Sequence, residues 1–512
     1  MPERLVECVP NFSEGRDPAK IRKITEAIEG VAGVRLLDVD PGADTNRTVV
    51  TFVGPPDAVA EAAFRAAATA AQVIDMRTHH GAHPRMGATD VCPFVPVAGV
   101  TMDDCVALAR KVGERIGREL EIPVYLYEYA ATRPQRRNLA EIRKGEYEGL
   151  AKKLADPAWA PDFGPARFHP TAGATCVGAR EFLIAYNITL NTRDKAAATD
   201  IAFELRERGR AARKPNPTPF YYRGEIMKYA PGFFPCGNCD FVGTTIEETQ
   251  AHCRDAHGYD LAELFAMWGQ KIEDPIGKTV RRAGRFRHCK AIGWYVAEYG
   301  RAQLSINLTN DKVTPPHLVL EEARRLATER GLVVTGSESV GVVPYRTLHA
   351  AGVFYLERQG RSPFVPPSDI LDTAVFSMGL SDVAPFEVEK KVLGLPAPGE
   401  LVSKRVVDFT DEVSRDTPAP GGGSVSALAG ALGAALGAMV ANLTHGKGGE
   451  DAEALLDVAR RAQEAKERLL SAVDDDTHAF NAYMEAMRLP RRTPEEKRVR
   501  AERIEAGLKA AV

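Results

Sequence analysis

The hydrophobic pattern changes character once along the chain, close to residue 393. Before that point, short runs rich in β-branched residues alternate with longer amphipathic segments, and beyond it the patterns are helical. Strands that alternate with helices pack as layers of sheet and helix, whereas helices alone pack against one another as a bundle. The sequence therefore predicts an α/β (α+β) region followed by an all-α domain.

The α/β region divides near residue 180 into two parts of similar style. In the first part a short apolar-rich run at 5–13 ends in a turn-forming cluster, and we expect strands at 34–42, 47–54 and 124–130 and helices at 17–33, 56–74 and 102–120. In the second part we expect a strand at 181–190, a helix at 195–213, sheet at 290–309 and a helix at 317–331. These patterns predict two subdomains, at 1–180 and 181–392.

The second subdomain is interrupted by a segment of different composition, 214–288, which is rich in proline and aromatic residues. Its removal would join a helix to the next strand through a connection of ordinary length, so we interpret it as an insertion. Within it, CGNCDFVGTTIEETQAHCRDAH (236–257) has the C-x2-C…H-x4-H spacing of a structural zinc site. The predicted zinc ligands are Cys236, Cys239, His252 and His257.

The sequence around these ligands also predicts how the motif folds. Thr245 and Glu248 are expected to form a capping box at the start of its helix, with Phe241 and Ile246 as a small apolar core. Thr249 stands where such motifs usually carry leucine, so a surface loop with incidental cysteines and histidines remains the alternative. Nucleic-acid binding is not expected, because the helix is acidic and the net charge of the chain is −3.

Residues 393–402 are expected to form a linker and residues 403–512 a helical domain. The charge-free stretch 424–444 has the length of a membrane span, but its Ala/Gly-rich composition favours a buried helix in a soluble bundle. Thr493, Pro494 and Glu496 mark the start of the last helix, which stops without a cap, so we expect the domain to be incomplete. Eight scattered cysteines and an N-terminus without an apolar signal segment favour a cytoplasmic protein and no membrane.

The densest chemistry lies in MRTHHGAHPRMGATDVCPF (76–94), with three histidines within five residues. Histidine exchanges protons near neutral pH, which suits general acid–base catalysis. A polar surface loop and a histidine-rich metal site are the alternatives. A second loop, DFGPARFHPTAGATCVGAR (162–180), is rich in Gly and Pro and can offer backbone N–H groups to a flat ligand.

Several long strings, in order, resemble the glutamate formiminotransferase–cyclodeaminase family of histidine degradation. They are VECVPNFSEGR (6–16), LLDVDPGADTNRTVVTFVGPP (36–56), GAHPRMGATDVCPF (81–94), PVYLY (123–127), IRKGEYEGL (142–150), WAPDFGP (159–165), KAIGWY (290–295) and APGGGSV (419–425). The resemblance covers everything except the insertion. It implies transfer of a formimino group from N-formimino-L-glutamate to N5 of tetrahydrofolate, and a homo-oligomer that is at least a dimer.

The resemblance also implies roles for particular residues. His83 stands where the family has its catalytic histidine, Asp40 is a candidate to orient it, and Arg85 is a candidate to hold a substrate carboxylate. Asp476, with the turn Gly421–Gly423, matches the acid/base site of the cyclodeaminase domain. The segment that matches the family's folate-binding segment is Gly164, Pro165, Ala166, Arg167, Phe168, His169, Pro170, Thr171, Ala172 and Gly173.

Two departures from the family pattern bear on function. The helical domain is about half the family's usual length, which puts the cyclodeaminase activity in doubt, and the insertion is absent from compact transferases. Two other readings stay open: an enzyme with a formyl rather than a formimino donor, and a folate-binding, zinc-stabilised scaffold without catalysis.

Overall fold

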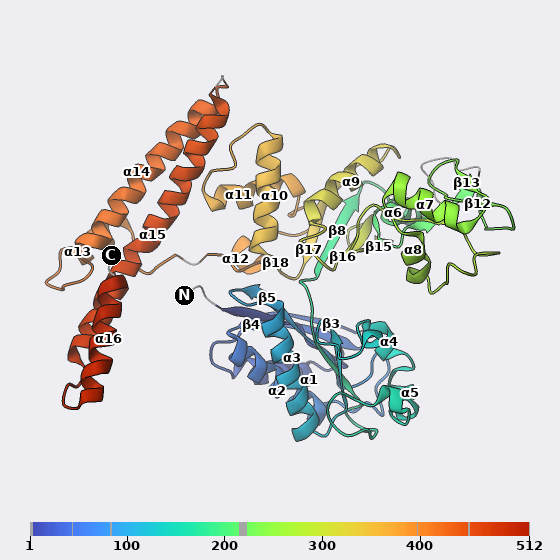
Figure 1. Cartoon of the computed structure of the whole chain (residues 1–512), viewed down its shortest axis with the longest axis horizontal. Coiled ribbons are helices and arrows are strands. Elements are labelled where there is room, and N and C mark those ends of the chain that lie inside the picture. The colour runs from blue at the N-terminus through green and yellow to red at the C-terminus, as the bar shows by residue number, and fades with distance from the viewer. Residues whose placement is uncertain are drawn as a thin grey trace. The chain divides into compact units, whose positions relative to one another are not determined.

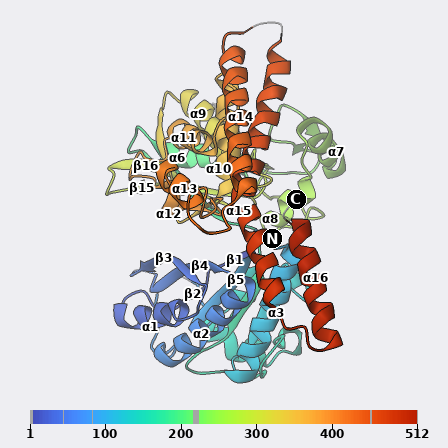
Figure 2. The ribbon, with the colours of Figure 1, turned by 90° about the vertical axis from the view of Figure 1, so that its left-hand side faces the viewer.

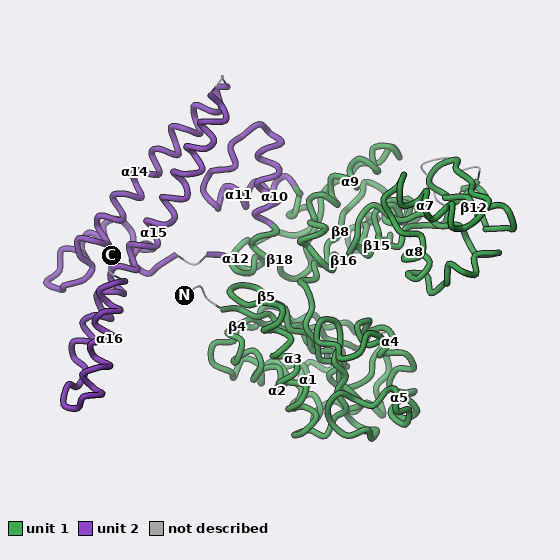
Figure 3. Tube along the Cα trace, viewed as in Figure 1, with its two compact units in different colours: residues 1–347, 378–394 green, residues 348–377, 395–512 purple. Residues whose placement is uncertain are grey.

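The computed structural model describes residues 4–43, 45–81, 84–214, 223–396, 398–448 and 451–510. These residues form two compact units (Figure 3). The larger unit comprises residues 1–347 and 378–394, and the smaller comprises 348–377 and 395–512. A mixed sheet and an antiparallel sheet with helices in the larger unit, and helices alone in the smaller, confirm the predicted fold class.

The first sheet of the larger unit runs in the order β1-β4-β2-β5-β7-β6, with β3 paired to β4. Its strands are β1 (Leu5–Cys8), β2 (Asn11–Phe12), β3 (Arg35–Gly42), β4 (Arg47–Gly54), β5 (Thr89–Ala98), β6 (Val124–Glu128) and β7 (Thr175–Ala179). The pairs β5–β7 and β6–β7 are parallel and the other pairs are antiparallel. Side chains alternate between the two faces along each strand, so β1 sends Val6 and Cys8 into a core and Glu7 to the opposite face.

Three helices cover one face of this sheet: α1 (Pro18–Glu29), α2 (Pro56–Val73) and α3 (Met102–Glu119). They lie on the same side of the strands in both views (Figures 1 and 2), and their alanine-rich and aliphatic faces form the main core. The opposite face, over β5–β7, is partly covered by short helices. These are η1 (Pro134–Arg136), α4 (Leu139–Arg143), α5 (Glu146–Leu154) and η2 (Pro157–Trp159).

The second sheet has the order β15-β16-β8-β17 and is antiparallel throughout. Its strands are β8 (Ile184–Leu190), β15 (Cys289–Val296), β16 (Arg301–Leu308) and β17 (Val334–Val340). The helices α6 (Lys195–Leu205) and α9 (Pro316–Thr328) pack on one face. The short strands β18 (Val343–Pro344) and β19 (Val392–Leu393) form a parallel pair, and β19 follows α12 (Val388–Lys391).

The insertion stands on a two-stranded stem and has a core of its own. The stem is β9 (Arg210–Ala211) paired with β14 (Arg281–Arg282). Between them come β10 (Arg213–Lys214), β11 (Glu225–Ile226), β12 (Phe234–Pro235), β13 (Val242–Gly243), α7 (Ile246–His257) and α8 (Leu261–Met267). The core gathers Tyr229, Phe234, Ile246, Leu261 and Phe265.

The smaller unit is helical. Its elements are α10 (Tyr345–Arg358), which begins in the larger unit, α11 (Pro367–Met378), α13 (Val406–Val413), α14 (Gly422–His445), α15 (Ala452–Arg488) and α16 (Pro494–Ala510). The helix α14 runs beside the first part of the longer α15, and α16 runs beside its last part (Figures 1 and 2). Thr493 Oγ1 accepts from Glu496 N and Glu496 Oε2 accepts from Thr493 N, at 3.1 and 2.9 Å, which confirms the predicted capping box.

Two predictions needed correction, and one strand was missed. The helix expected at 195–213 ends at Leu205, because Gly209 adopts a positive φ and the chain then forms β9 and β10. The strand β5 was not anticipated, since Pro93 and Pro96 argue against a central strand. The apolar helix α14 is buried on one face only: Leu432, Leu436 and Leu443 are each at least 60% exposed. Among the described residues it is the one helix whose length and composition would allow it to cross a membrane.

Candidate functional site

The histidine-rich loop is fixed by bonds to remote parts of the first subdomain. His79 is buried, and its Nδ1 accepts a hydrogen bond from Arg85 Nε at 3.2 Å. Its Nε2 therefore carries the proton and donates to Asn46 O at 2.8 Å. Burial lowers the pKa of His79, and the charge of Arg85 lowers that pKa further. These contacts describe a neutral histidine that supports the loop.

His83, the predicted catalytic histidine, lies outside the described residues. Pro84, which follows it in the chain, lines the large cavity described below, whereas His80 and Gly81 border a smaller hollow of about 420 Å³. Asp40, the predicted orienting carboxylate, is exposed on β3, opposite Val49 of β4. Its partnership with His83 stays a prediction.

Arg85 already holds two carboxylates of the chain. Its Nη2 donates to Glu148 Oε1 at 2.7 Å, and its Nη1 donates to Glu146 Oε2 at 3.1 Å. The hydrogen bond to Glu148 and the burial of the guanidinium act in opposite directions, and the net effect raises the pKa of Arg85. With these donors engaged, Arg85 ties the loop to α5, and its predicted role as a substrate ligand stays untested.

The predicted folate segment 164–173 packs against the histidine-rich loop, although the two are far apart in sequence. Thr171 O accepts from Met76 N, and Ala172 O accepts from Ala88 N, both at 2.9 Å. Gly173 has a φ of +68°, and a Cβ there would come within 2.1 Å of Met86 O. The close approach of the two segments therefore requires glycine at this position.

The first part of that segment faces elsewhere. Gly164, Pro165 and Arg167 border a separate hollow of about 500 Å³ against α3, and Arg167 pairs with the exposed Glu121. Phe168 packs on Tyr147, with ring centroids 5.3 Å apart. The structure thus brings the end of the segment to the loop and leaves its beginning at the surface.

A cavity of about 740 Å³ opens on the face of the first sheet that α1–α3 leave uncovered. This volume is typical of a site that binds a small molecule. Its walls come from β2, β4, β5, β6, α4 and the residues around β15. The basic lining residues are Arg47, Arg143, Lys144, Arg180 and Lys290. The acidic ones are Glu128, Glu146 and Glu181, so the walls carry an excess of positive charge.

Sequence reasoning missed the polar groups in this wall. Arg47, Asp90 and Arg143 lie in three different elements, and only the fold shows that they adjoin. All three occur in strings that carry the family resemblance, and this was the one feature of the sequence that could have marked them as functional residues.

A second group of predicted residues meets in the smaller unit. Asp476 of α15 accepts hydrogen bonds through Oδ2 from the backbone N of Ser424, at 2.9 Å, and from its Oγ, at 3.2 Å. A Cβ on Gly423 would lie 2.2 Å from Asp476 Oδ1, so the turn needs glycine there. Because Ser424 lies in the first turn of α14, its N–H is one of those free to bind an anion.

The neighbouring aspartates of α15 have different surroundings. Asp474 is buried and accepts from the backbone N of Leu401, at 2.7 Å, and of Val402, at 3.2 Å. Asp475 is exposed. Asp474 therefore anchors the chain that enters the helical domain, and Asp476 is the carboxylate at the Gly-rich turn.

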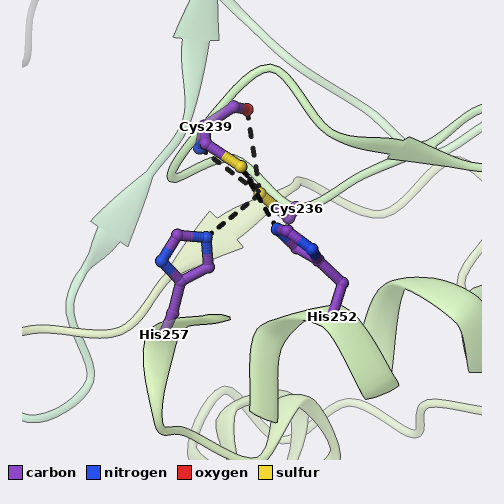
Figure 4. A group of neighbouring side chains, drawn as sticks. All are labelled: Cys236, Cys239, His252 and His257. Atoms are coloured by element: carbon purple, nitrogen blue, oxygen red, sulfur yellow. Dashed lines mark hydrogen bonds between the residues drawn. The ribbon is translucent and has the colours of Figure 1, made fainter. Parts of the chain in front are cut away.

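The four predicted zinc ligands converge in the insertion, as Figure 4 shows. Their ligand atoms all lie within 4.8 Å of one another. Cys236 Sγ is 3.3 Å from Cys239 Sγ and 3.8 Å from His257 Nε2, while Cys239 Sγ is 3.2 Å from His252 Nε2. A tetrahedral zinc with ordinary bond lengths separates its ligands by about 3.3–3.8 Å. Two thiolates and two imidazoles at these distances fit zinc.

The surroundings of this cluster refine the sequence predictions. Thr245 Oγ1 accepts from Glu248 N at 3.3 Å, but Glu248 accepts in return from Thr244 rather than from Thr245. Phe241 stacks on His252 at 4.0 Å, and Ile246 is buried. Thr249, which departs from the usual leucine, is fully buried and donates to Phe234 O at 2.5 Å. It therefore ties α7 to β12.

A polar, cation-rich cavity on a sheet face is typical of an α/β protein that binds anionic small molecules. Comparison with known proteins makes this specific. The family model of the formiminotransferase domain, N-terminal subdomain, matches residues 5–180, and that of the formiminotransferase domain matches 268–395. The formiminotransferase-cyclodeaminase model matches 405–512.

Whole-chain relatives agree with these matches. The formimidoyltransferase-cyclodeaminase of Mus musculus is 40% identical over 518 aligned residues, which cover 99% of this chain and 82% of the relative. That of Dictyostelium discoideum is 40% identical over 95% of this chain and 79% of the relative. The glutamate formimidoyltransferase of Streptococcus pyogenes serotype M1 is 36% identical over 69% of this chain and 94% of the relative. The chain belongs to the formimidoyltransferase-cyclodeaminase family.

Proposed function

We propose that this protein transfers the formimino group of N-formimino-L-glutamate to N5 of tetrahydrofolate and releases L-glutamate. Family membership along nearly the whole chain is the observation that carries this proposal. The cavity supports it, because both substrates carry carboxylates and the walls are rich in arginine and lysine. The reaction belongs to histidine degradation, and tetrahydrofolate is its co-substrate.

His83 is the proposed proton-transfer group. N5 of tetrahydrofolate attacks the amidine carbon of the donor and loses a proton, and the departing glutamate nitrogen gains one as its bond to carbon breaks. One imidazole with a pKa near neutrality can accept the first proton and supply the second. We assign Asp40 to the orientation of this imidazole and residues 164–173 to folate binding.

The helical domain carries the second proposed activity, that of a formimidoyltetrahydrofolate cyclodeaminase. N10 of the folate closes on the formimino carbon, and ammonia leaves as 5,10-methenyltetrahydrofolate forms. Asp476 is the proposed acid/base group for the proton that must move from N10 to the departing nitrogen. Its hydrogen bonds to Ser424 support this role, since they hold the carboxylate beside the Gly-rich turn.

The transferase proposal is tested by glutamate release from N-formimino-L-glutamate, with and without tetrahydrofolate. We expect folate-dependent release in the wild type and a loss of about 100-fold or more in His83→Ala. The absorbance of methenyltetrahydrofolate in the same reaction reports the second activity. A folded protein that binds folate but releases no glutamate would contradict the proposal.

Cys236, Cys239, His252 and His257 are the proposed ligands of a structural zinc ion. The metal would hold β12 and α7 together in a module with a small core, where such sites contribute directly to folding. We expect one zinc per chain by elemental analysis, its loss in Cys236→Ser, and a lower melting temperature. Cys253→Ser is the matched control, because Cys253 lies on the same helix and bonds to Tyr259 instead. Equal zinc content in all three proteins would exclude the site.

The remaining organisation is also proposed here. We place the domain boundaries at 1–180, 181–392 with the insertion 214–288, and 403–512 after a linker at 393–402. We also propose a cytoplasmic homo-oligomer of at least two chains that binds neither nucleic acid nor membrane. Light scattering of the purified full chain would give its mass, and a monomer at micromolar concentration would exclude the oligomer.

A further inference from the structure

Two arginines of the cavity wall form a small charged cluster with a buried aspartate next to them. Arg47 begins β4, Asp90 lies in β5 and Arg143 ends α4. Asp90 is almost fully buried; its Oδ2 accepts from Arg143, and its Oδ1 accepts from Met86 N at 2.9 Å. Asp90 is therefore bonded to Arg143, while Arg47 feels the negative charges of Asp90 and Asp40 without a hydrogen bond to either.

Arg47 is the unsatisfied member of the cluster. Its guanidinium makes no hydrogen bond or ion pair with any residue in the described ranges of the chain. Within the same ranges, the Nε atoms of Arg47 and Arg143 are both buried and lack a hydrogen-bond partner. Burial lowers the pKa of Arg47, and the positive charge of Arg143 lowers it further. The negative charges of Asp90 and Asp40 raise this pKa by less than it is lowered. A buried donor without an acceptor is costly, so this arrangement suits an anion that arrives from the cavity.

The cluster lies at the loop that carries the proposed chemistry. Asp90 holds both Arg143 and the backbone of Met86, and Pro84 lines the same cavity as the two arginines. Arg85, in contrast, is engaged by Glu146 and Glu148. Arg47, Arg143 and Arg180 are the arginines that line the cavity, and of these Arg47 and Arg143 adjoin Asp90 and so lie nearest to the loop.

We propose that Arg47 and Arg143 bind a carboxylate of the amino-acid donor, in the glutamate part of N-formimino-L-glutamate. The assignment rests on the transferase function proposed above. Arginine suits the task because its planar fork matches a carboxylate and remains charged when desolvated. Tetrahydrofolate also carries a glutamate carboxylate, but the contact with the loop at Met86 favours the donor, whose amidine carbon must react there.

The test separates the two substrates. In Arg47→Gln we expect the KM for N-formimino-L-glutamate to rise about 10- to 100-fold, because a hydrogen bond to a charged group is lost. The KM for tetrahydrofolate should stay within about twofold of the wild-type value. Arg47→Lys should recover part of the loss. Arg65→Gln is the control, because Arg65 lies on α2 with an exposed side chain paired to Glu61. Arg143→Lys keeps a charge beside Asp90 and so avoids leaving that carboxylate buried and alone.

Product binding gives a second measurement that needs no turnover. Calorimetric titration of wild type with L-glutamate, L-glutamine and isoglutamine should show that one of the two amides binds at least tenfold more weakly than glutamate. In Arg47→Gln the ratio of the Kd for that amide to the Kd for glutamate should fall close to one. The amide that loses affinity in wild type identifies the γ- or the α-carboxylate as the group that binds.

Three results would overturn the assignment. An unchanged donor KM in Arg47→Gln would show that Arg47 does not bind the donor. A rise confined to the KM for tetrahydrofolate would assign the carboxylate to the folate. A preference for glutamate that persists in Arg47→Gln would exclude the contact even if KM changed. Should the wild type release no glutamate, the transferase proposal itself fails, and the titrations still decide whether the carboxylate site exists.

Discussion

The two candidate sites are built in opposite ways. Around the cavity of about 740 Å³, groups from β4, β5 and α4 adjoin one another although they are far apart in sequence. In the helical domain, Asp476 needs only the first turn of α14 and one face of α15. The first site therefore depends on the whole larger unit, whereas the second depends on the register of two helices.

Burial differs in the same way. The first sheet has a continuous core beneath α1–α3, with smaller groups of residues on its other face. The pair α14–α15 is buried along one side, and large apolar residues of α14 remain exposed within the described chain. Since apolar burial is the main source of stability, we expect the two units to unfold in separate transitions, with the helical unit first.

The largest expected effect concerns the separation of the two activities. Asp476→Asn should reduce methenyltetrahydrofolate formation by about 100- to 10,000-fold, because the amide cannot exchange the proton. Glutamate release by the same protein should stay within twofold of wild type. Both rates come from one reaction with N-formimino-L-glutamate and tetrahydrofolate. If both fell together, the two sites would not be independent.

Glu7 should give the next largest effect, on the stability of the larger unit. It lies on β1, almost fully buried, and burial raises its pKa to about 7 even though the nearby charge of Arg180 lowers it. The unfolded chain binds its proton less tightly, so ionisation above pH 4.5 favours unfolding. The contribution of protonated Glu7 to the free energy of unfolding is fully present below pH 4.5, and it is lost as the pH rises to about 7.

Glu7→Gln should therefore stabilise the larger unit at pH 8, by about 3 kcal/mol at most, and should have little effect at pH 4. Thermal unfolding of the full chain between pH 4 and pH 8 measures this. The transition of the larger unit should become less pH-dependent, and that of the helical unit should not move. A variant with the same pH dependence as wild type would show that folding does not raise the pKa of Glu7.

Variants of Asp474 and Asp476 test whether the first carboxylate stabilises the helical unit and the second takes part in the cyclodeaminase reaction. Asp474→Asn removes the charge that accepts from Leu401 N and Val402 N, and we expect a loss of about 2 kcal/mol from the helical unit. The transferase rate should not change. Asp476→Asn should do the reverse, with a small change in melting temperature and a large loss of cyclodeaminase rate. If both variants lost the same free energy of unfolding, the two aspartates could not be assigned separate roles.

Local features were predictable from the sequence, and features that join distant segments were not. The strand expected at 47–54 is β4, and the four predicted zinc ligands converge as their spacing suggested, because a turn and one helix fix them. The strand β5 was missed because proline disfavours central strands, yet β5 pairs with β1, β2 and β7. Its Asp90 meets Arg143 across 53 positions, which no spacing rule reveals.

The roles of individual residues were less predictable than the elements that carry them. The spacing H-H-x-x-H does not distinguish a proton-transfer residue from a support, and the fold shows His79 to be buried and bonded on both ring nitrogens. Likewise, three consecutive aspartates suggest a solvated helix face. The structure gives them three different surroundings, because the Gly-rich turn and Leu401 approach different sides of α15.

The smallest expected effect tests the helical unit without touching either site. Thr493→Ala removes the side chain that accepts from Glu496 N at the start of α16, at a cost of about 1 kcal/mol. If the helices unfold as one cooperative unit, this change at a distant cap should shift the same transition as Asp474→Asn, and the two losses should add. If α16 frays alone, the cap variant should alter hydrogen exchange in α16 and leave the main transition in place. Either result shows whether α16 helps to fix the packing of α14 against α15, which holds Asp476 beside Ser424.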